Sequence, residues 1–191
     1  MTGSTERRPP FFFSKPSDAI VDTSLVTSIK FPPHSSNVQW EAELVVAIGK
    51  EGTHIPVSDS ISHVYGYAMG VDLTARDLQA KAKSEGKPWD LSKGFDFSGP
   101  ISPILPKENL PPLTNERIHL TVNGVLKQQS TIDKMIWSVP EIISYLSEKI
   151  HLKPGDLIYT GTPANVGTLF AGDVVESGGD GLPTCTFTMI K

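Results

Sequence analysis

The stretch that most constrains the fold of this chain is Glu41-Ala-Glu-Leu-Val-Val-Ala-Ile-Gly49. Apolar residues fill positions 44 to 48 and a turn-like sequence follows, so we predict a buried strand. Because side chains alternate along a strand, Glu41 and Glu43 project from the same face. Two carboxylates held side by side repel each other unless a positive group lies between them. The pair therefore fits either a hard divalent cation or the solvated end of a strand.

The glycines and prolines, sixteen of each, are spread along the 191 residues rather than clustered. This spread favours many short strands and irregular connections over a helical bundle. The length fits one domain with a substantial core. We therefore expect an α+β protein that is mainly β, with residues 1–10 as a flexible tail and residues 11–191 as the folded domain.

Charge and cysteine content argue against several classes of function. The formal net charge is −4, and Arg7 and Arg8 are too few to form a basic arm, so we expect no nucleic acid partner. No apolar run approaches the ~20 residues of a membrane span, so we expect no membrane partner. The single cysteine, Cys185, lies in a strand-like run and is expected to be a buried thiol rather than a nucleophile. These features indicate the cytoplasm, with an organelle matrix as the alternative.

Turn and capping signals predict the next elements. Residues 64–71 read as a strand, followed by a helix over 75–84 that Thr74 caps and Gly86 ends. Asp72 would then lie at a strand-to-helix junction, which is typical both of binding residues and of acids at a helix start. Lys93 falls in a stretch without a predictable element and, taken alone, fits a surface lysine.

The second half of the chain contains clearer signals for secondary structure. Asn123-Gly124 predicts a hairpin over residues 117–127, and Ser138 with Glu141 forms a capping box that opens a helix to about residue 150. Further strands are expected, over residues 24–31, 157–160, 173–176 and 184–190.

Five motifs, in this order, resemble the fumarylacetoacetate hydrolase family. They are Phe12-Phe-Ser-Lys-Pro16, Glu41-Ala-Glu-Leu-Val-Val-Ala-Ile-Gly-Lys50, Gly70-Val-Asp-Leu-Thr-Ala-Arg-Asp-Leu-Gln79, Lys93-Gly-Phe-Asp96, and Pro154-Gly-Asp-Leu-Ile-Tyr-Thr-Gly-Thr-Pro163 with Val166-Gly167. The resemblance covers residues 11–191 and is greatest to the small, single-domain acylpyruvate hydrolases. Because Trp89 precedes the Lys93-Gly-Phe-Asp96 motif, the chain most resembles the family members that cleave fumarylpyruvate.

The resemblance implies a fold of curved, mixed β-sheets that form a β-roll with a few short helices, usually as a homodimer. It also implies that Glu41, Glu43 and Asp72 ligate Mg²⁺ or Mn²⁺. Three carboxylates without Cys or His make the oxygen site that such hard cations prefer. Asp72 is expected to face the surface, so that Asp72→Ala should remove metal-dependent activity without unfolding the chain.

The implied reaction is cleavage of the C3–C4 bond of a 2,4-dioxo acid, fumarylpyruvate first, through a metal-stabilised pyruvate enolate. By resemblance, Lys93 and Arg76 supply positive charge around the substrate, and Lys93 also binds it. Gln79 would hydrogen-bond substrate oxygens, and Thr162 would hold the carboxylate from the Gly-Thr-Pro loop. The resemblance also implies a role in aromatic catabolism.

The main departure from the family pattern lies before Phe11. Small members usually carry a Gly-Arg-Asn-Tyr-like stretch followed by His-x-x-Glu, a dyad on a mobile lid that activates water. The ten residues before Phe11 contain no histidine, and the histidines present match no dyad position: His34, His54, His63, His119 and His151. We therefore expect a complete metal site without its water-activating lid, in a truncated chain or a natural short form.

Two alternatives stay open. Oxaloacetate decarboxylation or 2-oxo acid tautomerisation uses the same metal-stabilised enolate and needs no attacking water. An inactive paralogue would bind metal and 2-oxo acids without turnover, and the missing lid favours it. Product analysis separates the enzymes from each other, and metal-dependent turnover separates both from the binding protein.

Overall fold

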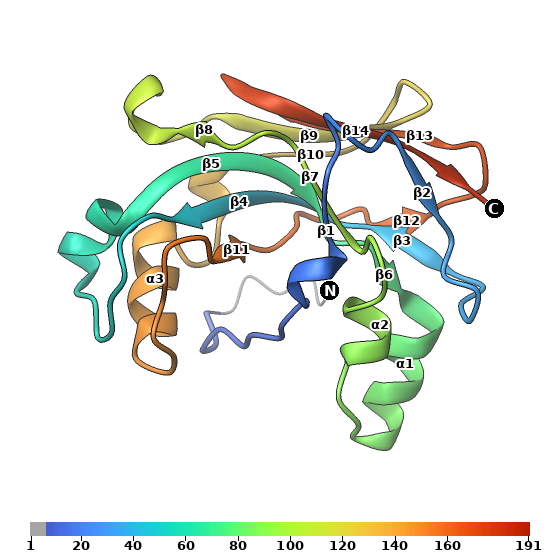
Figure 1. Ribbon diagram of the computed structural model, residues 1–191, viewed down its shortest axis with the longest axis horizontal. Coiled ribbons are helices and arrows are strands. Elements are labelled where there is room, and N and C mark those ends of the chain that lie inside the picture. The colour runs from blue at the N-terminus through green and yellow to red at the C-terminus, as the bar shows by residue number, and fades with distance from the viewer. Residues whose placement is uncertain (1–6) are drawn as a thin grey trace.

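The computed structural model describes residues 7–191, which form three curved β-sheets with short helices at their edges (Figure 1). The six-stranded sheet has the order β1 (Ile20–Asp22), β7 (Gly99–Ile101), β5 (Val64–Val71), β4 (Ala42–Ile48) and β11 (Leu157–Tyr159), with β8 (Leu105–Pro106) also paired to β5. Its β1–β7 pair is parallel and its other pairs are antiparallel. This confirms the expected mainly β fold of mixed, curved sheets.

A five-stranded sheet packs against the first, with contacts from β14 and β13 to β5. Its order is β10 (Val125–Thr131), β9 (Arg117–Val122), β13 (Val174–Gly179), β14 (Leu182–Ile190) and β2 (Ser28–Lys30). A three-stranded sheet contains β12 (Gly167–Thr168), β3 (Val38–Trp40) and β6 (Thr74–Ala75). The helices are α1 (Arg76–Glu85), α2 (Asp90–Lys93) and α3 (Val139–Ser147). Residues 7–191 also contain four 3₁₀ helices: η1 (Ser17–Ala19), η2 (Val57–His63), η3 (Lys107–Asn109) and η4 (Ile132–Lys134).

Strand β4 is buried along its whole length, which explains its nearly continuous apolar sequence. Leu44 and Val46 belong to the main core between the two large sheets. Val45 faces the other way, into a smaller cluster with Ala68 and Ile101. Because side chains alternate, Glu43 shares this second face with Val45. The strand that holds the core together therefore also fixes the direction of a buried carboxylate.

Short-range signals located several elements well. Asn123 and Gly124 both have positive φ, 52° and 74°, as the predicted hairpin turn requires. The Ser138–Glu141 capping box opens α3, although that helix ends at Ser147 rather than near residue 150. Helix α1 ends at Gly86 with φ of 64°, as predicted.

Other predictions need correction. Thr74 is not the cap of α1, because it lies in β6 and its hydroxyl donates to the Asp72 carbonyl; Ala75 holds the cap position. The predicted strand over residues 24–31 is shorter, since only residues 28–30 pair with β14. Lys93 belongs to a helix, α2, where no element was predictable.

The predicted tail, residues 1–10, falls mostly on residues outside the described range. Of the remainder, Arg7 lies over the Trp137 ring and pairs with Glu141, and the Arg8 carbonyl accepts a hydrogen bond from the Trp137 indole. No helix in the described part of the chain is long and apolar enough to cross a membrane.

Candidate metal centre and active site

The three predicted acidic ligands meet at one end of the β4–β5 pair. Glu41 lies directly before β4, Glu43 lies inside it, and Asp72 directly follows β5. Ala42 pairs with Val71 across the ladder, so the end of β5 brings Asp72 beside Glu41. The Asp72 N–H donates to the Glu41 carbonyl at 2.8 Å. One carboxylate oxygen from each acid lies within 4.8 Å of the other two.

The chemistry of this cluster fits a divalent hard cation. Glu41, Glu43 and Asp72 are 6%, 4% and 1% exposed. Burial, reinforced by the charges of Asp72 and Glu41, raises the pKa of Glu43 well above its usual value. Asp72 Oδ1 lies 2.8 Å from Lys15 Nζ, yet among the described residues it accepts no aligned hydrogen bond. Buried, converging carboxylate oxygens are the ligands that Mg²⁺ and Mn²⁺ prefer.

Lys93 is the cation at the centre of the cluster. Its Nζ donates to Glu41 Oε2 at 2.8 Å, to Asp72 Oδ2 at 2.5 Å and to Thr74 Oγ1 at 2.6 Å. Burial alone would lower the pKa of Lys93, but the charges of Asp72 and Glu41 outweigh it, so the pKa is raised and the ammonium is retained. The interpretation of Lys93 as a surface lysine was wrong, since its side chain is 2% exposed.

Asp72 is also more deeply placed than expected. Its side chain is 2% exposed and lies between the ammonium groups of Lys93 and Lys15. The expectation of a surface-facing ligand was wrong because the sequence does not show that α2 and the segment before η1 cover the end of β5. Removing one partner of a buried ion pair costs about 3–5 kcal/mol, so Asp72→Ala should also destabilise the fold.

Lys15 is a site residue that sequence reasoning missed. Its Nζ donates to Ser98 Oγ at 3.0 Å and to the Lys93 carbonyl, besides its ion pair with Asp72. Burial lowers the pKa of Lys15, and the Asp72 charge opposes that effect. The only signal for it was its place in the Phe-Phe-Ser-Lys-Pro motif, which by itself assigns no role.

Arg76 and Gln79 lie on one face of the first turn of α1. Arg76 donates to Glu41 Oε1 at 2.5 Å, to Gln39 Oε1 at 2.8 Å and to Gln79 Oε1 at 2.7 Å. Gln79 is 3% exposed. The structure therefore brings both predicted residues to the carboxylate cluster, with Arg76 as the link between them.

The glycine-rich loop after β11 closes the other side of the cluster. The Gly161 N–H donates to Glu43 Oε2 at 2.6 Å. Gly161 has φ of 101°, a conformation that favours glycine and allows this approach. Thr162 is 8% exposed and directly follows Gly161, the residue that donates to Glu43, so the predicted carboxylate-holding residue lies next to the carboxylate cluster.

Gln128 connects this loop to β4 and was not predicted. Its Oε1 accepts from the Ala42 N–H at 3.0 Å, between the two glutamates, and its Nε2 donates to Thr162 Oγ1 at 3.0 Å and to the Pro163 carbonyl at 2.9 Å. A bulge in β10 shifts the register just before Gln128, which is 1% exposed. A lone glutamine in a hairpin strand carries no signal of such a role.

Aromatic residues of the N-terminal segment cover the cluster. The Phe13 ring lies 4.9 Å from Lys93 Nζ. Phe11 and Phe13 both contact Trp89, with ring centroids 5.4 Å and 5.7 Å apart. The apolar cover reduces access of water to the charged groups, which strengthens their mutual interactions.

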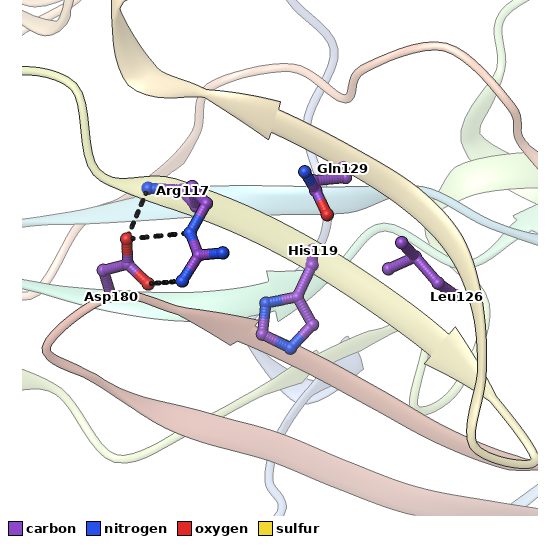
Figure 2. Close-up of a pocket in the computed structure, with 5 residues that line it drawn as sticks. All are labelled: Arg117, His119, Leu126, Gln129 and Asp180. Atoms are coloured by element: carbon purple, nitrogen blue, oxygen red, sulfur yellow. Dashed lines mark hydrogen bonds and ion pairs between the residues drawn. The ribbon is translucent and has the colours of Figure 1, made fainter.

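Two surface cavities differ in their relation to this centre. One, of about 340 Å³, includes Arg76 in its lining, which consists of Gln39, Arg76, Gln79, Ala80, Lys83 and Val166. The other, of about 240 Å³, lies over β9 and β10 and is lined by Arg117, His119, Leu126, Gln129 and Asp180 (Figure 2). None of the predicted site residues lies in the second cavity.

This architecture and this site define a known class of protein. The chain belongs to the fumarylacetoacetate hydrolase family, since the family model described as fumarylacetoacetate (FAA) hydrolase C-terminal matches residues 2–190.

The relatives make the class more specific. The chain is 41% identical to the fumarylpyruvate hydrolase of a Ralstonia species, over 94% of this chain and 92% of that protein. It is 42% identical to the mitochondrial oxaloacetate tautomerase of Mus musculus, over 96% of this chain and 82% of that protein. The solved structure of fumarylpyruvate hydrolase from Pseudomonas aeruginosa, in complex with Mn²⁺ and pyruvate, superposes with a TM-score of 0.93 at 42% identity, over 96% and 80%.

Proposed function

We propose that this protein is a divalent-metal-dependent hydrolase that cleaves the C3–C4 bond of an acylpyruvate, fumarylpyruvate first, to give pyruvate and a carboxylic acid. The observation that carries the proposal is the buried cluster of Glu41, Glu43 and Asp72 with Lys93 hydrogen-bonded inside it. It occurs in a chain 41% identical to a fumarylpyruvate hydrolase.

Glu41, Glu43 and Asp72 are proposed to hold Mg²⁺ or Mn²⁺. When bound, such a cation polarises the 2-oxo group and stabilises negative charge on its oxygen. The likeness to a structure described with Mn²⁺ and pyruvate supports this assignment.

We infer the roles of the other site residues from their charges and from the hydrogen bonds that they already make within the protein. The Lys93 ammonium, retained by its carboxylate neighbours, supplies positive charge toward the oxygen that becomes negative. Gln79 Oε1 accepts from Arg76, so its amide N–H groups are the ones to bind a substrate oxygen. Thr162 Oγ1 accepts from Gln128, so its own proton is available to a substrate carboxylate.

Hydrolysis adds the oxygen of water to the acyl carbon and breaks the carbon–carbon bond. The electron pair of that bond remains with the pyruvate fragment as an enolate, which then takes up a proton. We propose that Arg76 and Lys93 bind the substrate and stabilise this charge, because the ion pairs of both with Glu41 place two cationic groups at the proposed metal site.

Product analysis tests this function. The metal-free protein is incubated with fumarylpyruvate, with added Mg²⁺ or with EDTA, and fumarate and pyruvate are quantified separately. We expect both products in equal amounts with Mg²⁺ and neither above background with EDTA. Absence of both products in the presence of Mg²⁺ would overturn the proposal.

A second candidate is tautomerisation or decarboxylation of oxaloacetate. The 42% identity to a mitochondrial oxaloacetate tautomerase favours it, and the reaction needs the same stabilised enolate but no attacking water. The enol absorbance of oxaloacetate, followed together with pyruvate release, separates tautomerisation from decarboxylation. Mg²⁺-dependent binding of oxalate without turnover of either substrate would instead indicate a binding paralogue.

We also propose that residues 11–191 form one catalytic unit that works as a homodimer in the cytoplasm, on intermediates of aromatic catabolism. Family membership supports the dimer, and the single cysteine fits a reducing compartment. Light scattering during gel filtration tests the dimer, with about twice the monomer mass expected.

A further inference from the structure

The cavity beside the carboxylate cluster is formed largely by one face of α1. Arg76, Gln79 and Lys83 follow one another at spacings of three and four residues, so their side chains share that face. Gln39 from β3 and Val166 from the glycine-rich loop line the cavity as well. Its volume, about 340 Å³, is within the range of pockets that hold small organic ligands.

Helix α1 sets the order of the cationic groups along the cavity. Arg76 is the first residue of α1, and its Nη2 lies 2.5 Å from Glu41 Oε1. Lys83 lies near the other end of the helix, about 10 Å further along its axis at 1.5 Å per residue. A 2-oxo acid bound at the carboxylate cluster would therefore extend its other end along α1 toward Lys83.

Lys83 is the uncommitted cation of this cavity. Arg76 is engaged by Glu41, whereas Lys83 makes no ion pair with any residue in the described range. Its Nζ lies 4.7 Å from the centroid of the Trp89 ring, a cation–π contact that restrains the side chain. None of the described lining residues is a carboxylate, so a ligand carboxylate at this end would meet no like charge.

The lining of the cavity also suits a short carbon chain. Ala80, which follows Gln79 and precedes Lys83 on α1, and Val166 supply apolar surface to it. We propose that Lys83 binds the distal carboxylate of the acyl group and makes the site selective for 2-oxo acids with an anionic tail. This inference rests on the proposed function, because it takes the carboxylate cluster as the place where the 2-oxo acid end binds.

A matched pair of ligands tests this assignment without turnover. 2-Oxoadipate and 2-oxohexanoate carry tails of equal length that end in a carboxylate and a methyl group. Their affinities are measured by calorimetry for the full chain with saturating Mg²⁺. Lys83→Met removes the charge, Lys83→Arg keeps it, and Lys81→Met is the matched control, because Lys81 is exposed on α1 and does not line the cavity.

We expect the unmodified protein to bind 2-oxoadipate at least tenfold more tightly than 2-oxohexanoate. Lys83→Met should weaken 2-oxoadipate binding by about 10- to 100-fold, the range for a charge-assisted hydrogen bond, and change 2-oxohexanoate binding by less than about twofold. Lys83→Arg should keep most of the preference, and Lys81→Met all of it.

The outcomes separate this inference from the proposed function. An unchanged preference in Lys83→Met would overturn the role of Lys83, even if fumarylpyruvate is hydrolysed. A preference that depends on Lys83 in a protein that hydrolyses no acylpyruvate would keep the role and overturn the function. Failure of both acids to bind with Mg²⁺ would overturn both.

Discussion

Two clusters of paired charges lie in different parts of the molecule. Lys93 and Asp72 are both 2% exposed at the carboxylate cluster, whereas Arg117 and Asp180 are 63% and 48% exposed on the outer face of the five-stranded sheet (Figure 2). Exposed pairs are screened by solvent and contribute little, while buried charges are costly to desolvate. The buried cluster is therefore not explained by stability alone, which is why it, and not the outer cavity, indicates function.

Charge balance distinguishes the two regions further. Three carboxylates, those of Glu41, Glu43 and Asp72, face the cations Lys15, Lys93 and Arg76, so the formal charges of the cluster balance without a metal ion. A divalent cation would leave an excess of positive charge in a buried place. An anionic substrate would offset that excess, so metal and substrate should favour each other's binding.

The largest effect is expected from Asp72→Asn, which keeps the size of the side chain and removes its charge. Activity should fall by more than about 100-fold, because even residues that only support metal ligands can contribute that much. Lys93 and Lys15 would also lose a buried partner, so we expect a loss of about 3–5 kcal/mol in the free energy of unfolding. Metal titration and urea unfolding measure both effects, and turnover like that of the unmodified protein would contradict the metal assignment.

Lys93→Met should have the next largest effect on activity. We expect kcat to fall by about 100- to 1000-fold, as for the loss of one group that stabilises developing negative charge. Metal affinity should change far less than kcat, since Lys93 donates to the carboxylates and does not supply a ligand. If the variant instead loses metal binding and its fold together, Lys93 has a structural role only.

Gln128→Ala tests the connection between β4 and the loop at Thr162. It leaves the buried Ala42 N–H unpaired, so we expect a cost of about 1–3 kcal/mol in unfolding free energy. KM should rise by about tenfold as the loop loosens, with a smaller change in kcat. A variant with unchanged KM and a lower unfolding free energy would mean that Gln128 serves the fold alone.

Cys185 is a buried residue without an ion-pair partner in the described part of the chain. We predict that its thiol does not react with a disulfide reagent in the folded protein. Burial raises the pKa of Cys185 to about 12, and the hydrogen bond with Thr23 only partly opposes this. The thiolate is therefore only a very small fraction of the thiol at pH 8, and the folded protein should not react appreciably with a disulfide reagent. The thiol should react fully in urea, and rapid reaction before unfolding would show that the β14 region opens readily.

The smallest effect is expected at the exposed pair. Arg117→Ala should leave both kcat/KM and the urea midpoint unchanged within error, because the pair with Asp180 is on the surface. A large loss of activity in this variant would place function on the outer sheet and reverse the comparison between the two regions.

Local patterns were enough to predict part of this arrangement. The spacing of Glu41 and Glu43 gave their shared face, and Asn123-Gly124 located the hairpin. Local patterns could not predict how deeply Asp72 and Lys93 are buried, or the contacts of Lys15 and Gln128. These features depend on contacts between segments that are far apart in the sequence. Lys15 reaches Asp72 across the fold, and Gln128 reaches Ala42 from another sheet.

Electron paramagnetic resonance of Mn²⁺ tests most directly whether the buried carboxylates form a metal centre for 2-oxo acids. The protein is first freed of metal and then titrated with Mn²⁺, with and without pyruvate, beside Asp72→Asn and Arg117→Ala. We predict one bound Mn²⁺ per chain, a spectrum that pyruvate changes, loss of binding in Asp72→Asn, and normal binding in Arg117→Ala. Equal Mn²⁺ binding by Asp72→Asn and the unmodified protein would contradict the account.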